Sequence, residues 1–258
     1  MTIPTYLTID LETVPDLEPA RLLVPGGKNM TKEQLRLELG NLYARPGEEG
    51  GSGWIKSALH KIVAIGFQSL QEDGAPIEEA AAIIEPENER RALEAFDRML
   101  EDRPVLVTFN GSAYDLPVLR YRALATGTSM PNFLSSMRPR SRGQGVSVDY
   151  FHRYSPAHID LMDRLCSYGA ATRPSLAEAA ALIGLQAKDG VDGGDVERLA
   201  ADGDWSRISS YVRRDVEVTT ALFRAFLAMS EPISRPPASS ASPSFHRGHR
   251  PAANRGFR

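Results

Sequence analysis

Short apolar runs along the chain predict a series of strands. Each run contains β-branched or aromatic side chains, which favour strands. The predicted strands cover residues 6–11, 62–70, 80–84 and 105–109. Residues 159–162 are compatible with a short fifth strand or with the start of a helix, and the local pattern does not decide between them.

Apolar residues that recur every three or four positions predict helices between and after these strands. In the segment 89–100, one stripe is formed by Leu93, Phe96, Met99 and Leu100. Further helices are predicted at residues 31–43, 116–125, 175–183, 196–201 and 205–229. Three consecutive strands followed by alternating strands and helices indicate an α/β fold, and the order contains no repeat of fixed period.

Two acids lie at the end of the first predicted strand. Asp10 and Glu12 are two residues apart, and side chains at that spacing lie on the same face of a strand. Both carboxylates are therefore expected to point at one spot. Carboxylate oxygens are the ligands that Mg²⁺ and Mn²⁺ prefer.

Three further candidates lie in other predicted elements. Tyr211 and Asp215 are four positions apart on the last predicted helix, so one lies above the other on the helix surface. Asp115 follows the strand 105–109 and a turn at Asn110, which places it near a helix start at the carboxyl end of a strand. Open α/β sheets usually bind ligands at that edge.

Acids that converge from separate elements suit a pair of divalent cations, as in two-metal phosphodiester hydrolases. Taken singly, each acid is better explained as a surface carboxylate or a helix cap. Four acids and a tyrosine in three separate segments favour the metal site instead. We therefore predict a shared site formed by Asp10, Glu12, Asp115, Tyr211 and Asp215.

The same three segments resemble the motifs of the DEDD superfamily of 3'-5' exonucleases, in its tyrosine-bearing (DEDDy) branch, and in particular the proofreading domain of family B DNA polymerases. The motifs read Thr-Ile-Asp-Leu-Glu-Thr at 8–13, Asn-Gly-x-x-Tyr-Asp-x-Pro at 110–117 and Tyr-x-x-x-Asp at 211–215. Segments 158–163 and 175–185 and Lys188 also resemble that family's pattern, and the likeness spans roughly residues 5–229. It implies a ribonuclease-H-like mixed sheet, with three antiparallel strands followed by parallel strands, flanked by helices.

The resemblance also implies an activity: metal-dependent 3'-5' exonuclease cleavage that releases nucleoside monophosphates from single-stranded 3' ends, with DNA favoured over RNA. Asp10 would bridge two Mg²⁺ or Mn²⁺ ions, and Glu12, Asp115 and Asp215 would complete the ligands. Tyr211 would hydrogen-bond the attacking water and orient it. Two rival hypotheses stay open. One is a 3'-5' exoribonuclease of short RNA, and the other is a non-catalytic nucleic-acid-binding domain, which would gain nothing from clustered carboxylates.

Too few residues remain outside the likeness for the other polymerase modules, so the chain resembles a stand-alone exonuclease. We expect one domain over residues 1–231, with insertions near residues 14–60 and 128–156. Residues 232–258 contain five arginines and no acids, and their Pro, Ser and Ala content predicts disorder. This basic tail is a candidate tether for nucleic acid or a plain solubilising segment.

Weaker candidates for substrate contacts also have simple structural explanations. Asn110 belongs to an Asn-Gly pair, which is a common turn sequence. Asp160, with His158, falls in a segment that would either support the site through hydrogen bonds or serve the structure alone. Lys188 is a candidate phosphate contact or a solvated side chain, at the start of a glycine-rich segment that we interpret as a turn.

Arginines and aromatic residues occur together before the fifth predicted strand: Arg138, Arg140, Arg142, Tyr150, Phe151 and Tyr154. Single-strand channels combine cations with rings in this way, because phosphates pair with the charges and bases stack on the rings. The rings are equally well explained as part of the core.

Composition agrees with a soluble enzyme and restricts the alternatives. The 258 residues are 42% hydrophobic and carry a net charge of −3. Cys166 is the only cysteine, so no internal disulfide forms and a cytoplasmic location is expected. The amino-terminal sequence shows neither a basic leader nor a long apolar stretch, so no membrane association is expected. No motif indicates a protein partner, a P-loop, a serine hydrolase or a zinc site.

Overall fold

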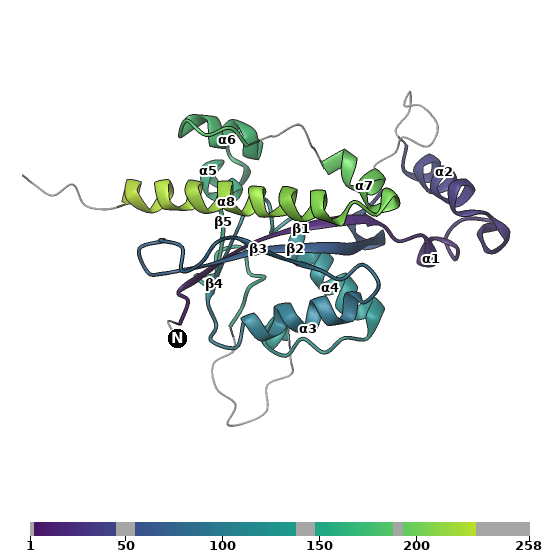
Figure 1. Cartoon of the computed structure of the whole chain (residues 1–258), viewed down its shortest axis with the longest axis horizontal. Coiled ribbons are helices and arrows are strands. Elements are labelled where there is room, and N and C mark those ends of the chain that lie inside the picture. Colours follow the sequence, from purple (N-terminus) through teal and green to yellow (C-terminus); the bar gives the residue numbers. More distant parts are fainter. Residues whose placement is uncertain (1–2, 45–54, 138–147, 188–192, 231–258) are drawn as a thin grey trace, which may run out of the picture.

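A five-stranded mixed sheet forms the centre of the protein, and helices cover both of its faces (Figure 1). The computed structural model describes residues 3–44, 55–137, 148–187 and 193–230. The strands are β1 (Tyr6–Pro15), β2 (His60–Leu70), β3 (Ala81–Ile84), β4 (Val105–Thr108) and β5 (His158–Asp160). The basic tail, residues 232–258, lies outside the described residues.

The strand order is β3-β2-β1-β4-β5, with β1 in the middle. β1 pairs antiparallel with β2, and β2 pairs antiparallel with β3. On the other side, β1 pairs parallel with β4, and β4 pairs parallel with β5. The predicted ribonuclease-H-like sheet, with three antiparallel strands followed by parallel strands, is confirmed.

The strand boundaries differ from the predicted ones chiefly at β1. This strand continues beyond Leu11 to Pro15, because its residues stay paired with β2 as far as the pair Pro15 and His60. A register shift between Glu12 and Thr13 interrupts the ladder on the way. Residues 159–162 include both of the elements that the sequence allowed, a short strand and the start of a helix. The strand β5 ends at Asp160, and the helix begins at the next residue.

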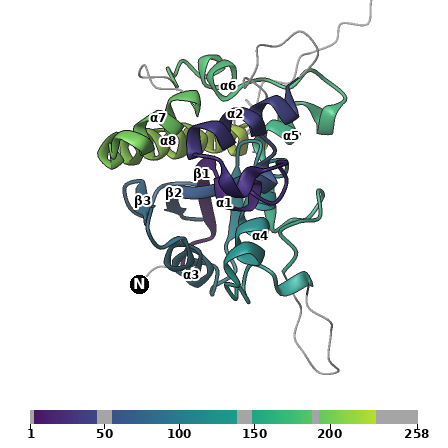
Figure 2. The ribbon, with the colours of Figure 1, turned by 90° about the vertical axis from the view of Figure 1, so that its right-hand side faces the viewer.

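The helices form two layers around the sheet and a group at one end. Their bounds are α1 (Leu17–Ala20), α2 (Lys32–Tyr43), α3 (Glu89–Met99), α4 (Asp115–Thr126), α5 (Leu161–Leu165), α6 (Leu176–Leu182), α7 (Val196–Asp202) and α8 (Trp205–Ser230). The long helix α8 crosses one face, with α5, α6 and α7 on its side, and α3 and α4 cover the opposite face (Figure 1). Figure 2 shows α1 and α2 together at the end of the molecule near α7.

Side-chain alternation along β1 assigns its residues to the two faces. Leu7, Ile9 and Leu11 are buried in the core that α3 and α4 cover. Thr8 points the other way, and its hydroxyl oxygen accepts a hydrogen bond of 3.0 Å from the hydroxyl of Thr220 on α8. The even-numbered positions of β1 therefore face α8, and the acids of this strand lie beneath that helix.

Gly66 allows α8 to lie close to the sheet. It stands beside Asp10 in the β1–β2 register, and a Cβ atom there would come within 2.7 Å of Val212 and 2.9 Å of Val216. Contacts that short do not occur between real side chains, so a larger residue would move the helix. Both valines and Ile208 are fully buried against the sheet. The absence of a side chain at this glycine thus sets the height of α8 above the site.

The first predicted insertion forms a small core of its own. α1, α2 and the helical turn Ser57–Leu59 just before β2 bury Ala20, Leu35, Leu39 and Leu59 together. The helix α2 begins with a capping box, in which Thr31 and Gln34 bond each other's backbone N–H groups. Hydrophobic packing therefore fixes α2 without help from the ion pairs on its surface.

An arginine joins the start of this insertion to the helices under the sheet. Arg122 of α4 is buried and makes ion pairs of 2.7 Å with both Asp16 and Glu89. Its guanidinium satisfies two carboxylates at once, so the loss of this side chain would leave buried charges without a partner. Among the helices in the described ranges, none combines the length and apolar character needed to cross a membrane.

Candidate active site

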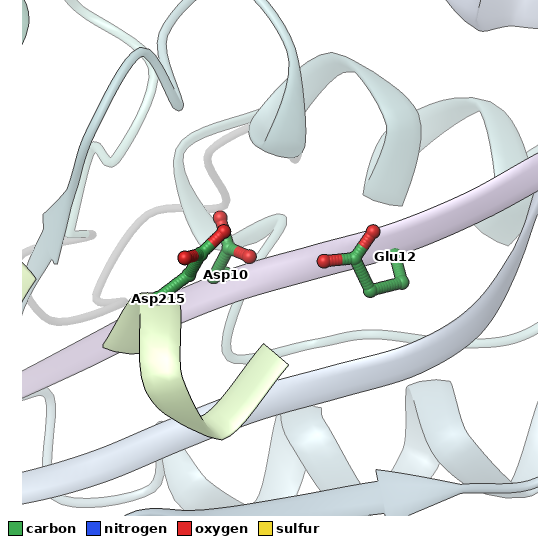
Figure 3. Close-up of side chains that lie close together, drawn as sticks. All are labelled: Asp10, Glu12 and Asp215. Atoms are coloured by element: carbon green, nitrogen blue, oxygen red, sulfur yellow. The ribbon is translucent and has the colours of Figure 1, made fainter. Parts of the chain in front are cut away.

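Three of the predicted acids meet above the middle of the sheet. Asp10 and Glu12 project from β1 towards α8, and Asp215 comes down from that helix to meet them (Figure 3). Each offers one carboxylate oxygen, and these oxygens all lie within 4.8 Å of one another. Residues two apart on the strand share a face, and the close approach of α8 at Gly66 brings the third acid within reach.

Asp115 lies beside this cluster as the first residue of α4. Its side chain is buried, and its Oδ1 atom has no hydrogen-bond partner among the described residues. Burial raises the pKa of this carboxyl to about 7. A buried carboxylate oxygen without a donor is unfavourable unless it binds a cation, so Asp115 fits the donor set of a metal site.

Charge repulsion among the acids is strong in the protein alone. Burial raises the pKa of Asp10 well above its usual value, and the neighbouring carboxylates Asp115, Glu12 and Asp215 raise it further. Burial and the charges of Asp215 and Asp115 likewise raise the pKa of Glu12. Divalent cations reverse this balance, because they favour the ionised form of every carboxylate around them. The cluster thus has the composition and the electrostatics expected of a site for divalent cations.

Tyr211 lies one turn before Asp215 on α8, and its phenol hydrogen-bonds the carboxyl of that residue. Burial raises the pKa of Tyr211, and the negative charges of Asp215 and Glu12 raise it further. The phenol therefore keeps its proton at neutral pH and acts as a hydrogen-bond donor. All five predicted site residues accordingly lie in one region of the structure.

A pocket of about 420 Å³ opens over the cluster, within the ~300–1,000 Å³ range of small-ligand sites. Its walls come from β1, β2, α7, α8 and the first insertion. The residues that line the pocket include Asp10, Glu12, Arg36, His60, Tyr114, Glu197, Tyr211 and Asp215. Acids and hydroxyl-bearing residues thus make up half of the residues that line the pocket.

A network of hydroxyl and imidazole groups forms one wall and was not predicted from the sequence. Thr13 Oγ1 hydrogen-bonds His60 Nδ1 at 2.8 Å and also the phenol of Tyr114. Tyr114 OH lies 3.3 Å from the same imidazole nitrogen. Thr13 and Tyr114 directly adjoin the metal-site candidates Glu12 and Asp115 along the chain. Their position inside the motifs was a signal for them, whereas the sequence around His60 contains none.

Asp160 and Asn110, the weaker candidates, support the loop that leads to Asp115. The Asp160 carboxylate accepts hydrogen bonds of 2.9 Å from the backbone N–H groups of Asn110 and Ser112. It also accepts the N–H of Met162 and so caps α5. This arrangement favours the supporting role for Asp160. A contact of Asn110 or Asp160 with substrate stays a prediction.

The structure describes the candidate aromatic residues but not the candidate arginines. Arg138, Arg140, Arg142 and Lys188 lie outside the described residues. Tyr150 is fully buried and donates a hydrogen bond of 3.1 Å to the carbonyl of Pro104. Phe151 is partly buried and packs edge to face against the core residue Phe133, whereas Tyr154 is exposed. The two inner rings therefore belong to the core, which was the alternative explanation for them.

A family model shows where the chain belongs. The model of a predicted 3'-5' exonuclease related to the exonuclease domain of PolB matches residues 52–240. That range contains Asp115, Tyr211 and Asp215, and the acids of β1 precede it. No curated protein matches the chain.

A solved structure shares the fold. The family B DNA polymerase from the hyperthermophilic archaeon Pyrobaculum calidifontis superposes with a TM-score of 0.51 at 17% sequence identity. The alignment covers 86% of this chain and 24% of the polymerase chain, so this protein spans about a quarter of the polymerase's length. By the family match, which covers most of its length, the chain belongs to the predicted 3'-5' exonucleases related to the exonuclease domain of PolB.

Proposed function

We propose that this protein is a metal-dependent 3'-5' exonuclease that releases nucleoside monophosphates from single-stranded nucleic acid, with DNA favoured as the substrate. The observation that supports it is the convergence of Asp10, Glu12 and Asp215 within 4.8 Å of one another, beside the buried and unpartnered carboxylate oxygen of Asp115. Carboxylates this close together repel one another when no cation is bound. With divalent cations bound, the same carboxylates suit the hydrolysis of a phosphodiester.

Each residue has a role in this mechanism. Asp10, Glu12, Asp115 and Asp215 would hold two divalent cations, Mg²⁺ or Mn²⁺, and Asp10 would be the ligand common to both because the charges of the other three acids all act on it. The bound cations supply Lewis-acid stabilisation of the charge that develops on the scissile phosphate. Tyr211 keeps its proton and orients the attacking water by a hydrogen bond, without ionising itself. The pocket would receive the terminal nucleotide beside the acids.

The test uses short DNA and RNA oligonucleotides labelled at the 5' end. The purified protein is incubated with each, single-stranded or as a blunt duplex, in Mg²⁺, Mn²⁺ or chelator. We expect a ladder of shortened labelled products from single-stranded DNA that requires metal and disappears with chelator. A faster ladder from RNA would support the exoribonuclease instead, and binding without any cleavage would support a non-catalytic domain.

We also place the enzyme in the cytoplasm, as part of the same proposal. Cys166 is buried and free in the structure, so the fold uses no disulfide that would require an oxidising compartment. Activity on nucleic acid in the reducing conditions of that compartment would agree with this assignment.

A further inference from the structure

An ion pair crosses the mouth of the metal-site pocket. Arg36 of α2 donates hydrogen bonds of 2.9 Å from Nε and 3.2 Å from Nη2 to the two carboxylate oxygens of Glu197 on α7. The partners are 161 residues apart in the chain, and both line the pocket that holds Asp10 and Asp215. Their elements approach each other at the end of the molecule that Figure 2 faces.

Arg36 stands out by its charge. The described residues that line the pocket include four acids, Asp10, Glu12, Glu197 and Asp215, and a single lysine or arginine, which is Arg36. An oligonucleotide whose terminal phosphodiester lies at the metal site carries the next phosphate a few ångströms further along. That phosphate enters an acidic surrounding and needs a cation, and a guanidinium binds phosphate oxygens in a planar, two-pronged geometry.

We propose that Arg36 binds a non-scissile phosphate of the single-stranded substrate, and that Glu197 holds the guanidinium at the pocket mouth until the substrate takes its place. The inference rests on the proposed exonuclease function and names the residue that recognises the strand behind the cleaved nucleotide. Residues 17–43, with α1 and α2, precede the range of the family match, which begins at residue 52. Arg36 would therefore add a substrate contact from the segment between β1 and β2.

The exchange of partners is physically easy. The side chains of Arg36 and Glu197 keep 32% and 45% of their exposure, so solvent screens the pair and its rupture costs little. The helix α2 does not depend on the pair, because Leu35 and Leu39 anchor it in the core of the insertion. A phosphate that replaces the carboxylate would meet the same two donor groups, Nε and Nη2, in the same fork.

Two substitutions by the same neutral residue, glutamine, distinguish phosphate binding by Arg36 from an ion pair that only joins α2 to α7, which we call a structural clasp. Arg36→Gln removes the cation, and Glu197→Gln breaks the same ion pair but leaves the cation in place. With a single-stranded DNA oligonucleotide and Mn²⁺, we expect Arg36→Gln to raise KM by about tenfold or more. Loss of a hydrogen bond to a charged group weakens binding by about this factor. We expect Glu197→Gln to leave KM unchanged or lower, because the guanidinium loses its competitor.

Two further measurements identify the contact as a phosphate. The slope of log affinity against log salt should decrease by about 0.7 in Arg36→Gln, as for the loss of one phosphate contact on a single strand. The p-nitrophenyl ester of thymidine 5'-phosphate has one phosphate and no neighbouring one. Arg36→Gln should therefore slow its hydrolysis much less than it slows cleavage of the oligonucleotide.

Other outcomes would overturn the inference. Equal increases of KM in both variants would show that the pair acts only as a clasp, and an unchanged KM in Arg36→Gln would remove the phosphate contact. Thermal unfolding of each variant shows whether the fold is intact. If the wild-type protein binds the oligonucleotide but cleaves neither substrate, the proposed function fails, and the dissociation constants of the two variants still decide the role of Arg36. Absence of any oligonucleotide binding by the wild type would overturn both.

Discussion

Asp10 carries an electrostatic cost in the site. Its carboxyl is held by burial and by three neighbouring acids in a state that resists ionisation, and divalent cations are what would make ionisation favourable. The variant Asp10→Asn removes the charge and keeps the shape. We expect it to abolish nuclease activity, and to leave the melting temperature of the metal-free protein unchanged or raise it, because repulsion among the acids is reduced.

The matched control is Glu94→Gln, which neutralises an exposed acid on α3. Its activity and melting temperature should equal those of the wild type. Wild-type activity in purified Asp10→Asn would remove this residue from the metal site.

A variant of Tyr211 can distinguish the orientation of the attacking water from the binding of metal. The variant Tyr211→Phe removes the hydroxyl that hydrogen-bonds Asp215 and leaves the four carboxylates, so metal affinity should fall far less than turnover. Loss of a positioned hydrogen-bonding group lowers turnover by about 10²-fold or more. Titration of Mn²⁺ by calorimetry, beside kcat at saturating substrate, tests both parts. A fall in Mn²⁺ affinity equal to the fall in kcat would contradict the role given to the phenol.

His158 contributes a pH dependence to stability that is independent of the metal site. It is buried, Thr108 hydrogen-bonds its Nε2 atom at 2.8 Å, and burial lowers its pKa to about 4. The unfolded chain has the ordinary value of about 6.5. Stability from this residue is complete above pH 6.5 and is lost as pH falls towards 4, because only the unfolded chain takes up the proton.

This loss is on the order of a few kcal/mol, because a pKa lowered from about 6.5 to about 4 favours the neutral imidazole in the folded protein. Urea unfolding of the wild type and of His158→Gln, near pH 7 and near pH 4.5, measures it. The free energies of unfolding of the two proteins should converge as pH falls. Parallel curves would show that the imidazole is protonated in the folded protein.

At the scale of elements, the site depends on how closely α8 approaches the sheet. Gly66→Ala would place a methyl group within 2.7–2.9 Å of α8 atoms and force the helix outwards. Overpacking of this kind costs about 1–3 kcal/mol. Because α8 carries Tyr211 and Asp215, we expect nuclease activity to fall further than stability alone explains.

The double variant Gly66→Ala, Val212→Ala removes one of the side chains that the new methyl group would meet. It should regain part of the lost activity, although the Val212 carbonyl oxygen would still lie 2.9 Å away. Activity and urea midpoint measured on the same samples show the coupling. A single variant with wild-type values in both would contradict the close contact between α8 and β2.

Elements with a local signal were predicted from the sequence, and those that depend on distant contacts were not. The period of α8 and the β-branched runs of β1 and β2 are properties of short segments, so their existence and type were correctly predicted. The extension of β1 to Pro15 depends on pairing with β2, which begins at His60. The short helix α1 has four residues, too few for a periodic pattern.

The residues of the site also divide into those with a local sequence signal and those that depend on distant contacts. Strand and helix spacing placed Asp10 beside Glu12 and Tyr211 above Asp215, because these relations arise within one element. His60 and Arg36 reach the pocket only through tertiary contacts of the first insertion. Arg36 meets its partner across 161 residues, and no pattern near it in the sequence indicates that contact.

At the scale of the whole molecule, the metal site should make the stability of the protein depend on cations and on pH together. In the metal-free protein, the folded-state pKa of Asp10, Glu12 and Asp115 is above the unfolded value. The stability that these groups contribute is complete below the unfolded pKa near 4, and it is lost as pH rises to about 7, where Asp115 ionises. Divalent cations bind the ionised carboxylates, so their stabilising effect grows over the same interval.

We therefore expect Mn²⁺ to raise the melting temperature of the wild type more near pH 8 than near pH 5. A cation concentration about 100 times its dissociation constant stabilises the folded state by about 2.7 kcal/mol. Chelator should reverse the shift, and Asp10→Asn should lose most of it while Glu94→Gln keeps it. A shift in the wild type of equal size at both pH values would mean that the cation binds away from these acids. In that case the nuclease mechanism would lose its metal site, although the fold would stand.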